Sequence, residues 1–153
     1  MGSNNSNQLL CLQNSGFNSL YGIELQSYAV ELSKSRTKNI NIIQGSAFDI
    51  PYRNGFFDLV FTSGVLIHIA PEDIPKVIDE MYRCTRKYIW CSEYYADVYT
   101  QVHYRGHEDL LWKTDFSGLF QKQFRDLRLV KEEHIKYLND DNIDTMFLIE
   151  KKG

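Results

Sequence analysis

Glu24 is the first residue whose position suggests chemistry. It ends the short apolar run Leu20–Glu24, and a helix is expected directly after it. In doubly wound α/β folds an acid at the carboxyl end of a strand binds a ribose, because its two oxygens accept both hydroxyl protons. The alternative is a carboxylate that only stabilises the amino terminus of the next helix.

The turn after the next predicted strand is a second candidate. The segment Gly45–Pro51 combines backbone amides with the ring of Phe48, and such a loop can hold an adenine ring. Asp49 could then accept a hydrogen bond from the exocyclic amine. The same residues also suit an ordinary turn built from glycine, aspartate and proline. Neither Glu24 nor this turn is specific when considered alone.

Three histidines and one glutamate are candidates for acid–base chemistry. A base of near-neutral pKa could take a proton from an oxygen nucleophile, and histidine is the usual residue in that role. His68 follows a predicted strand and has the alternative role of capping the next turn. We prefer His103 and His107 as catalytic residues, because they lie in the predicted substrate loop. Glu93, at the end of a strand, could orient or replace them.

A zinc site does not explain the cysteines and histidines of this chain. His103 and His107 have a suitable spacing, but Cys84 and Cys91 are too far apart for a usual ligand pair. Cys91 also lies inside a predicted strand. We therefore predict no metal.

Short apolar runs alternate with helical patterns along the chain, which is typical of βαβ units in a doubly wound sheet. Strands are predicted at residues 20–24, 40–43, 57–62, 87–91, 126–130 and 145–150. The strand at 57–62 is nearly continuously apolar, which indicates burial on both faces. An apolar stripe at helical spacing predicts a helix that begins near Asp73 and includes Ile74, Val77, Ile78, Met81 and Tyr82. Residues 94–115 have no clean period and are expected to form a long loop.

The composition predicts one globular domain and excludes several classes of protein. Among 153 residues, 17 basic and 20 acidic side chains give a net charge of −3, which argues against nucleic-acid binding and a polybasic membrane patch. No apolar run approaches the ~20 residues of a membrane span. The first residues lack the features of a signal peptide. Three cysteines without a C-x-x-C motif favour reduced thiols in the cytoplasm.

Taken together and in this order, Tyr21–Glu24, Gly45–Pro51 and Phe57–His68 resemble the class I S-adenosylmethionine-dependent methyltransferases. The resemblance extends over the whole chain. It implies a three-layer Rossmann-like α/β fold with a mostly parallel sheet and an antiparallel terminal strand, which binds the cofactor at the carboxyl ends of its strands. The implied cofactor contacts are Glu24 for the ribose, Ser46, Ala47, Phe48 and Asp49 for the adenine, and Thr62, Ser63, Gly64 and His68 near the methionine part.

The chain departs from the family pattern at its amino terminus. The family's first strand ends in an acid and a glycine-rich loop, and only the tail of that loop, with Gly2 and Ser3 as implied cofactor contacts, is present here. That strand lies in mid-sheet, between the strands at 20–24 and 57–62, so its loss leaves two inner edges unpaired. We therefore expect either an oligomer that forms through the opened sheet or a rearranged sheet without a well-formed cofactor pocket.

A closer resemblance lies further along the chain. Tyr104–Glu108 and Leu111–Phe116 are similar to the methylases associated with pseudaminic acid biosynthesis, which implies a nucleotide-linked or acidic sugar as the acceptor. The residue types suit such a ligand, because cationic groups bind phosphate or carboxylate and aromatic rings stack on a sugar face. The candidates are Tyr104, Arg105, Trp112 and Lys113. The alternative is a packed aromatic flap with surface charges.

The main hypothesis is methyl transfer from S-adenosylmethionine to a small polar, sugar-derived acceptor. One alternative is a non-catalytic methyltransferase-like fragment with a structural or oligomeric role, which titration with S-adenosylhomocysteine would distinguish. Another is a nicotinamide oxidoreductase, since an acid that binds ribose serves either cofactor. The chain has no G-x-G-x-x-G motif and no Tyr-x-x-x-Lys pair, which argues against that reading.

Overall fold

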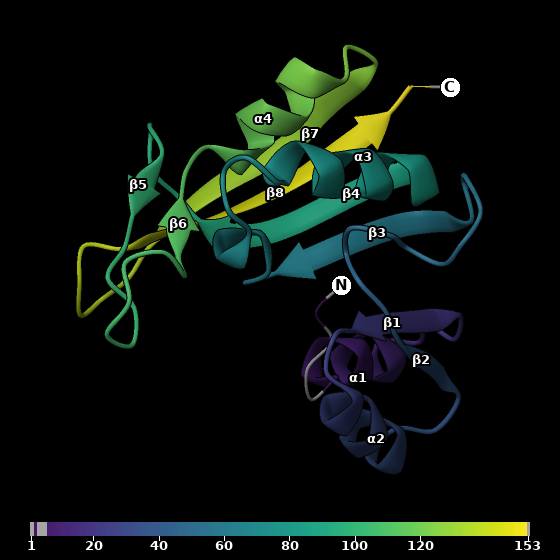
Figure 1. Cartoon of the computed structure of the whole chain (residues 1–153). Coiled ribbons are helices and arrows are strands. Elements are labelled where there is room, and N and C mark those ends of the chain that lie inside the picture. The colour runs from purple at the N-terminus through teal and green to yellow at the C-terminus, as the bar shows by residue number, and fades with distance from the viewer. Residues whose placement is uncertain (1, 3–5, 153) are drawn as a thin grey trace. The chain divides into compact units, whose positions relative to one another are not determined.

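The computed structural model describes residue 2 and residues 6–152 (Figure 1). The chain divides into two compact units, Met1–Pro51 and Tyr52–Gly153. The strands form a two-stranded sheet in the first unit, and a four-stranded sheet and a short hairpin in the second. Within the described residues no helix is both long enough and apolar enough to cross a membrane.

The amino-terminal unit is a helix followed by one βαβ unit. Its elements in chain order are α1 (Asn7–Asn14), β1 (Leu20–Glu24), α2 (Ser27–Arg36) and β2 (Ile40–Gln44). β1 and β2 are parallel, with Leu20 opposite Ile40 and Glu24 opposite Gln44. Gly16, at φ +94°, closes α1 in the left-handed conformation that favours glycine, as the sequence predicts. The core of this unit contains Leu9, Ile23, Val30, Ile42 and Ile50.

The carboxy-terminal unit contains a mixed four-stranded sheet. Its strands are β3 (Phe57–Ser63), β4 (Thr85–Tyr94), β7 (Leu127–Lys136) and β8 (Ile143–Lys151), in the order β3-β4-β8-β7. β3 is parallel to β4, whereas β8 is antiparallel to both of its neighbours. An antiparallel last strand was expected. β7 and β8 extend beyond the predicted ranges, because charged residues continue β7 in ladder contact with β8 and show no apolar period.

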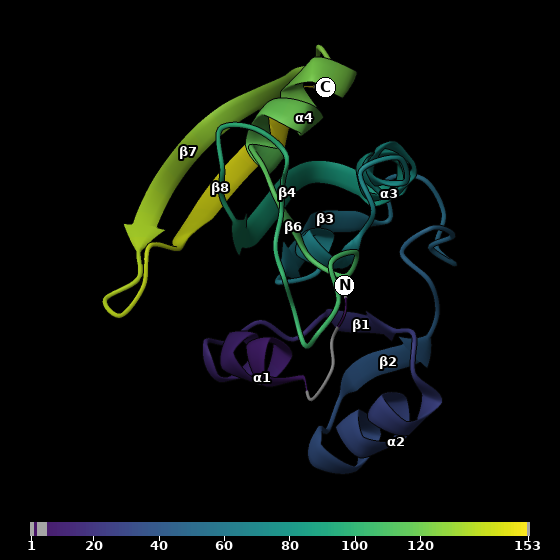
Figure 2. The same ribbon diagram turned by 60° about the vertical axis from the view of Figure 1, so that its left-hand side comes forward.

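Two helices of this unit, α3 (Ile74–Cys84) and α4 (Phe116–Gln123), pack against the sheet, as Figure 2 shows, and side chains at the end of α4 contact α3. Tyr82 of α3 stacks on Phe124 at 3.7 Å between ring centroids, and Gln123 donates to the Pro75 carbonyl at 2.9 Å. The apolar stripe predicted for α3 is confirmed, and it joins strand residues in the core: Ile74, Val77, Ile78, Met81, Ile89, Phe120, Phe147 and Ile149 are at most 1% exposed.

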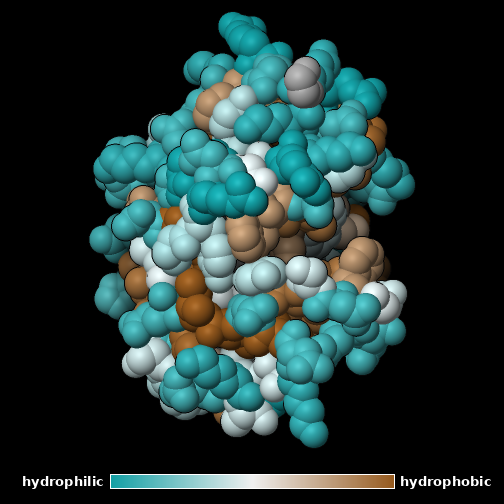
Figure 3. All heavy atoms as spheres, turned by 90° about the vertical axis from the view of Figure 1, so that its right-hand side faces the viewer, coloured by the Kyte–Doolittle hydropathy of each residue, from teal (hydrophilic) through white to brown (hydrophobic). Residues whose placement is uncertain are grey.

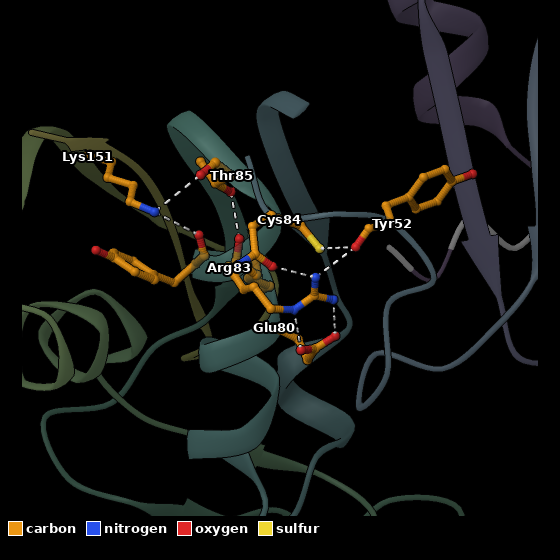
Figure 4. Close-up of polar contacts among 9 residues, drawn as sticks. Tyr52, Glu80, Arg83, Cys84, Thr85 and Lys151 are labelled. Atoms are coloured by element: carbon orange, nitrogen blue, oxygen red, sulfur yellow. Dashed lines mark hydrogen bonds and ion pairs between the residues drawn. The ribbon is translucent and has the colours of Figure 1, made fainter. Parts of the chain in front are cut away.

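Arg83 ties the end of α3 to the loop that leads into β3 (Figure 4). Its guanidinium forms two bonds of 2.7 Å with the Glu80 carboxylate and donates to the Tyr52 carbonyl at 2.7 Å and to Asn54 Oδ1 at 3.0 Å. A planar fork of this kind fixes geometry as well as charge. The Cys84 thiol donates to the same Tyr52 carbonyl at 3.6 Å, so two side chains from the end of α3 hold the loop.

Lys151, the last residue of β8, meets the same end of α3 (Figure 4). Its ammonium donates to the carbonyls of Tyr82 and Thr85 at 3.2 and 3.4 Å and lies 3.6 Å from the Tyr82 ring centroid. The last carbonyls of a helix lack partners within the helix and attract cations. Lys151 thus couples the carboxy-terminal strand to α3.

The segment from 94 to 115, expected to be a long loop, contains a β-hairpin instead. β5 (Thr100–Gln101) pairs antiparallel with β6 (Trp112–Lys113), and Val102 donates to the Leu111 carbonyl at 2.9 Å. Tyr104 and His107 exchange backbone bonds of 2.8 and 3.0 Å around Arg105 and Gly106, both with positive φ. Strands of two residues are too short to show a sequence period, and arginine is unusual in a turn of this type. We call residues 100–113 the 100–113 hairpin.

The surface carries both hydrophilic residues and apolar side chains. Figure 3 shows one face that is largely hydrophilic but includes a patch of apolar residues. β3 is an edge strand of its sheet. The prediction that it is buried on both faces is wrong for Leu59, which is 41% exposed, whereas Val60 and Thr62 face the core. The apolar side chains of β3 are therefore buried on one face of the strand only.

Candidate functional site

The amino-terminal unit places the predicted ribose acid next to the predicted adenine turn. Glu24 ends β1 and is partly exposed, and the Gly45 amide donates to its carbonyl at 3.0 Å. A Cβ on Gly45 would lie 2.9 Å from Ile23 Cγ2, so glycine is needed for this close approach of β2 to β1. One oxygen of the Glu24 carboxylate accepts from the Gln26 amide at 3.2 Å, just ahead of α2. This contact supports the alternative that Glu24 stabilises the amino terminus of that helix.

The turn at 46–49 is built by backbone and serine contacts. The Asp49 main-chain amide donates to the Ser46 carbonyl at 3.3 Å, and the Phe48 amide donates to Ser46 Oγ at 3.1 Å. The Phe48 side chain is 43% exposed, Asp49 is exposed and Ala47 is half-buried. The turn reading is therefore correct, and it leaves an aromatic face available for a flat ligand. Contact with adenine stays a prediction.

The turn after β3 carries the residues predicted to face the methionine part of the cofactor. Thr62 is fully buried, whereas Ser63 is half-buried. Gly64 has φ +62° and donates to the Ser92 carbonyl at 2.9 Å, which extends the contact of β3 with β4 by one residue. A Cβ on Gly64 would meet no atom within 4 Å, so the conformation rather than the space favours glycine there.

Glu93 lies inside the protein beside this turn. Its side chain is 2% exposed, the Val65 amide donates to both of its oxygens at 3.2 and 3.0 Å, and the Ile67 amide donates to one at 3.4 Å. Burial raises the pKa of Glu93 to about 7, while the Thr62 hydroxyl and these amides act in the opposite direction. The predicted catalytic role of Glu93 is untested, and its surroundings are backbone rather than solvent.

His68, at the end of the 3-10 helix η1 (Leu66–His68), contacts the 100–113 hairpin. Its Nδ1 lies 2.8 Å from the Leu110 carbonyl, and its ring is 5.6 Å from that of Tyr104. A carbonyl oxygen only accepts, so Nδ1 carries the proton and Nε2 of the neutral ring is the acceptor. His68 is exposed and therefore has the form of an oriented base. Sequence reasoning missed Leu110, because a main-chain carbonyl leaves no residue signature.

The other candidates on the hairpin lie at its surface. His103 Nδ1 is 2.8 Å from Glu108 Oε1, and both side chains are exposed. The Arg105 guanidinium carbon lies 5.1 Å from the Tyr104 ring centroid, and His107 closes the turn. The structure thus brings His68, the two hairpin histidines and two of the predicted acceptor contacts to one segment.

The remaining candidates have varied settings. Trp112 is half-buried in β6, and Lys113 donates to Asn142 Oδ1 at 3.4 Å. Gly2 is exposed, with φ +61°, and Ser3 lies outside the described residues. Within residues 2 and 6–152, no group of three or more His, Cys, Asp or Glu side chains is arranged to hold a metal ion.

Comparison with known proteins gives the family. The family model described as methyltransferase domain matches residues 1–89, so the chain belongs to that family. The expected class is confirmed: the chain is an S-adenosylmethionine-dependent methyltransferase. The family match does not favour the non-catalytic alternative and argues against an oxidoreductase. No curated protein sequence matches the chain.

Solved structures share its fold. An S-adenosylmethionine-dependent methyltransferase from Methanosarcina mazei is 13% identical, with a TM-score of 0.78 over 99% of this chain and 90% of the other. A Burkholderia thailandensis N1-methyltransferase, solved with 1,6-didemethyltoxoflavin and S-adenosylhomocysteine, is 11% identical, with a TM-score of 0.80 over 99% and 69%. The PH0226 protein of Pyrococcus horikoshii is 14% identical, with a TM-score of 0.76 over 99% and 79%. At these identities the likeness shows the α/β Rossmann-like fold.

The raised pKa of Glu93 predicts a pH dependence of stability. The folded state holds the proton more tightly than an unfolded chain, in which the pKa is near its ordinary value of 4.5. This contribution to the free energy of unfolding is fully present below about pH 4.5 and is lost as the pH rises through about 7. Urea denaturation at several pH values, compared between wild type and Glu93→Gln, checks this. Parallel stability–pH curves for the two proteins would contradict it.

Proposed function

We propose that this chain transfers the methyl group of S-adenosylmethionine to an oxygen of a small polar acceptor, a nucleotide-linked or acidic sugar. The observation that carries the proposal is the contact between His68, which follows β3, and the 100–113 hairpin. It puts aromatic and cationic side chains at the carboxyl end of a parallel strand, where doubly wound folds bind their ligands. The proposal accounts for an ordered hairpin with an exposed cationic turn.

The proposed cofactor contacts are supported by residue types that suit S-adenosylmethionine. In the amino-terminal unit the Glu24 carboxylate would hold the ribose hydroxyls, and the exposed ring of Phe48 would stack on the adenine, with Ser46, Ala47 and Asp49 around it. In the carboxy-terminal unit Ser63, Gly64 and His68 would face the methionine part, whereas Thr62, which is fully buried, would only support this turn. Bound there, the cofactor supplies a methyl carbon that is already electrophilic.

In such a reaction the residues of this chain would align the acceptor and accept its proton. Alignment of the acceptor oxygen with the methyl carbon and sulfur contributes most of the rate. A histidine would take the hydroxyl proton as the acceptor oxygen receives the methyl group, so that the products would be a methyl ether, S-adenosylhomocysteine and a protonated imidazole. His103, oriented by Glu108, and His107 are the proposed bases, and His68 is a third candidate because its tautomer is set by Leu110.

Acceptor binding would use the hairpin. Arg105 lies beside the ring of Tyr104, so a sugar phosphate or carboxylate could pair with the cation while the ring covers an apolar face of the sugar. Trp112 and Lys113 offer the same two kinds of group on β6. We further propose a cytoplasmic location, since Cys11, Cys84 and Cys91 are all free thiols.

We also propose that the chain forms a homo-oligomer through the edge of β3. This strand has seven residues and no proline, and it carries one charged residue, Asp58. Long apolar edge strands without blocking residues pair readily with other chains. Leu59 leaves an apolar side chain 41% exposed on this strand.

Loss of the Glu24 carboxylate should weaken cofactor binding. Glu24→Ala is expected to reduce the binding free energy of S-adenosylhomocysteine by about 1.5–3 kcal/mol, the range for hydrogen bonds to a charged group. Titration calorimetry measures the change, and Glu31→Ala, an exposed acid on α2, is the control. Unchanged affinity with an unchanged fold would remove Glu24 from the site.

Changes in the hairpin should affect the acceptor and spare the cofactor. Arg105→Ala and Trp112→Ala are each expected to lower kcat/KM for a nucleotide-linked sugar about tenfold or more, because an ionic or stacking contact is lost. The affinity for S-adenosylhomocysteine should stay near that of wild type. Arg86→Ala, an exposed arginine at the start of β4, is the control. Normal acceptor kinetics combined with lower stability would show that the hairpin is only a packed flap.

Self-association through β3 should respond to a charge on that strand. Wild type is expected to sediment as an oligomer whose fraction rises with concentration, and Leu59→Lys should shift it towards monomer. Leu138→Lys is the control, because Leu138 is fully exposed in the turn between β7 and β8. A wild-type protein that sediments as a monomer at all concentrations would refute self-association.

A further inference from the structure

Glu93 has surroundings that differ from those of every other acid described in the carboxy-terminal unit. It is the only Asp or Glu among the buried residues of the described chain. The other acids with a resolved pKa shift, Glu133 and Glu150, pair with cations at the surface, and their pKa values are lowered. A buried carboxylate without a cationic partner is costly, so its retention needs a specific set of hydrogen bonds.

Those hydrogen bonds come from one turn. β3 and β4 are parallel, with Ser63 opposite Ser92, so the chain leaves β3 beside the end of β4 where Glu93 projects. The amides of Val65 and Ile67 point at its carboxylate from within the turn. Those amides are at the start of η1, where backbone donors have no partner in the helix itself. The Glu93 carboxylate therefore accepts the hydrogen bonds of amides that follow β3 and no longer pair with β4.

The turn 64–68 also contacts the 100–113 hairpin. His68 follows Ile67 directly, and its Nδ1 donates to the Leu110 carbonyl at 2.8 Å. A change in the conformation of Val65–Ile67 must therefore move His68 relative to the hairpin. The path runs from a buried acid through two amides to an exposed imidazole, and each step is a contact shorter than 3.5 Å.

We propose that Glu93 is a positioning residue: its buried carboxylate holds the turn 64–68 in the conformation that presents Gly64 and His68 to the cofactor and the 100–113 hairpin. The role of that turn in ligand binding rests on the proposed function. Glu93 does not touch a ligand in this scheme. It acts through the main chain of Val65 and Ile67.

The test compares wild type with Glu93→Gln in the full chain. Oε2 of Glu93 accepts from the Val65 and Ile67 amides, and Oε1 accepts from Val65 as well. Glutamine keeps the volume and one carbonyl oxygen, but its NH2 group at the place of Oε1 would face the Val65 amide, donor against donor. We expect faster hydrogen exchange at the Val65 and Ile67 amides and a changed NMR signal of the His68 ring. The affinity for S-adenosylhomocysteine should fall about tenfold. Glu133→Gln, an exposed acid on β7, should change none of the three.

A second variant covers the case in which glutamine prevents folding. Glu93→Asp keeps the charge but is one methylene shorter, so it cannot reach both amides, and the same three changes are expected. Exchange rates and a His68 signal equal to those of wild type would overturn the positioning role. Faster exchange with unchanged affinity for S-adenosylhomocysteine would also overturn it, because the acid would then serve stability alone. If wild type does not bind S-adenosylhomocysteine, the proposed function fails, and exchange together with the His68 signal decides the positioning role by itself.

Discussion

The parallel pairing of β3 with β4 is the constraint on which the candidate site in the carboxy-terminal unit depends. Because the two strands run in the same direction, both end at one edge of the sheet. The register sets Ser63 against Ser92, and Gly64 adds one more bond to the Ser92 carbonyl. Every later contact, from Glu93 to the turn and from His68 to the hairpin, requires this alignment. A shift of one residue would turn Thr62 away from the core.

The energetics of this edge explain why a glutamate is suitable at position 93. Two buried amides without acceptors would cost about 1–3 kcal/mol each. Satisfying them with a carboxylate requires its desolvation, which raises the pKa of Glu93 to about 7. Burial therefore favours the protonated acid, whereas the amide hydrogen bonds favour the carboxylate. The Thr62 hydroxyl, buried beside this carboxylate, acts in the direction opposite to burial and lowers that pKa.

The opposite end of the same strands is held by different chemistry. Arg83 donates to the Tyr52 carbonyl, ahead of β3, and has the Glu80 carboxylate as its counter-charge (Figure 4). Lys151 donates to carbonyls at the end of α3. Cations are suitable there because a helix ends in exposed carbonyls, whereas the turn after β3 presents amides and needs an acceptor. The sheet of the carboxy-terminal unit is thus held by donors at one end and by an acceptor at the other.

The sequence by itself determined which segments fold and to which family they belong. The apolar stripe from Ile74 to Met81 predicted α3, and the order of Tyr21–Glu24, Gly45–Pro51 and Phe57–His68 indicated the methyltransferase class, because local periodicity and motif order are properties of the chain alone. Only the tertiary structure decided the partners. The Leu110 carbonyl opposite His68 and the burial of Glu93 depend on contacts between segments distant in sequence. The 100–113 hairpin and the carboxy-terminal half of β7 depend on antiparallel pairing that leaves no apolar period in the sequence. Main-chain donors and acceptors carry those contacts, and residue types do not record where a main-chain group points.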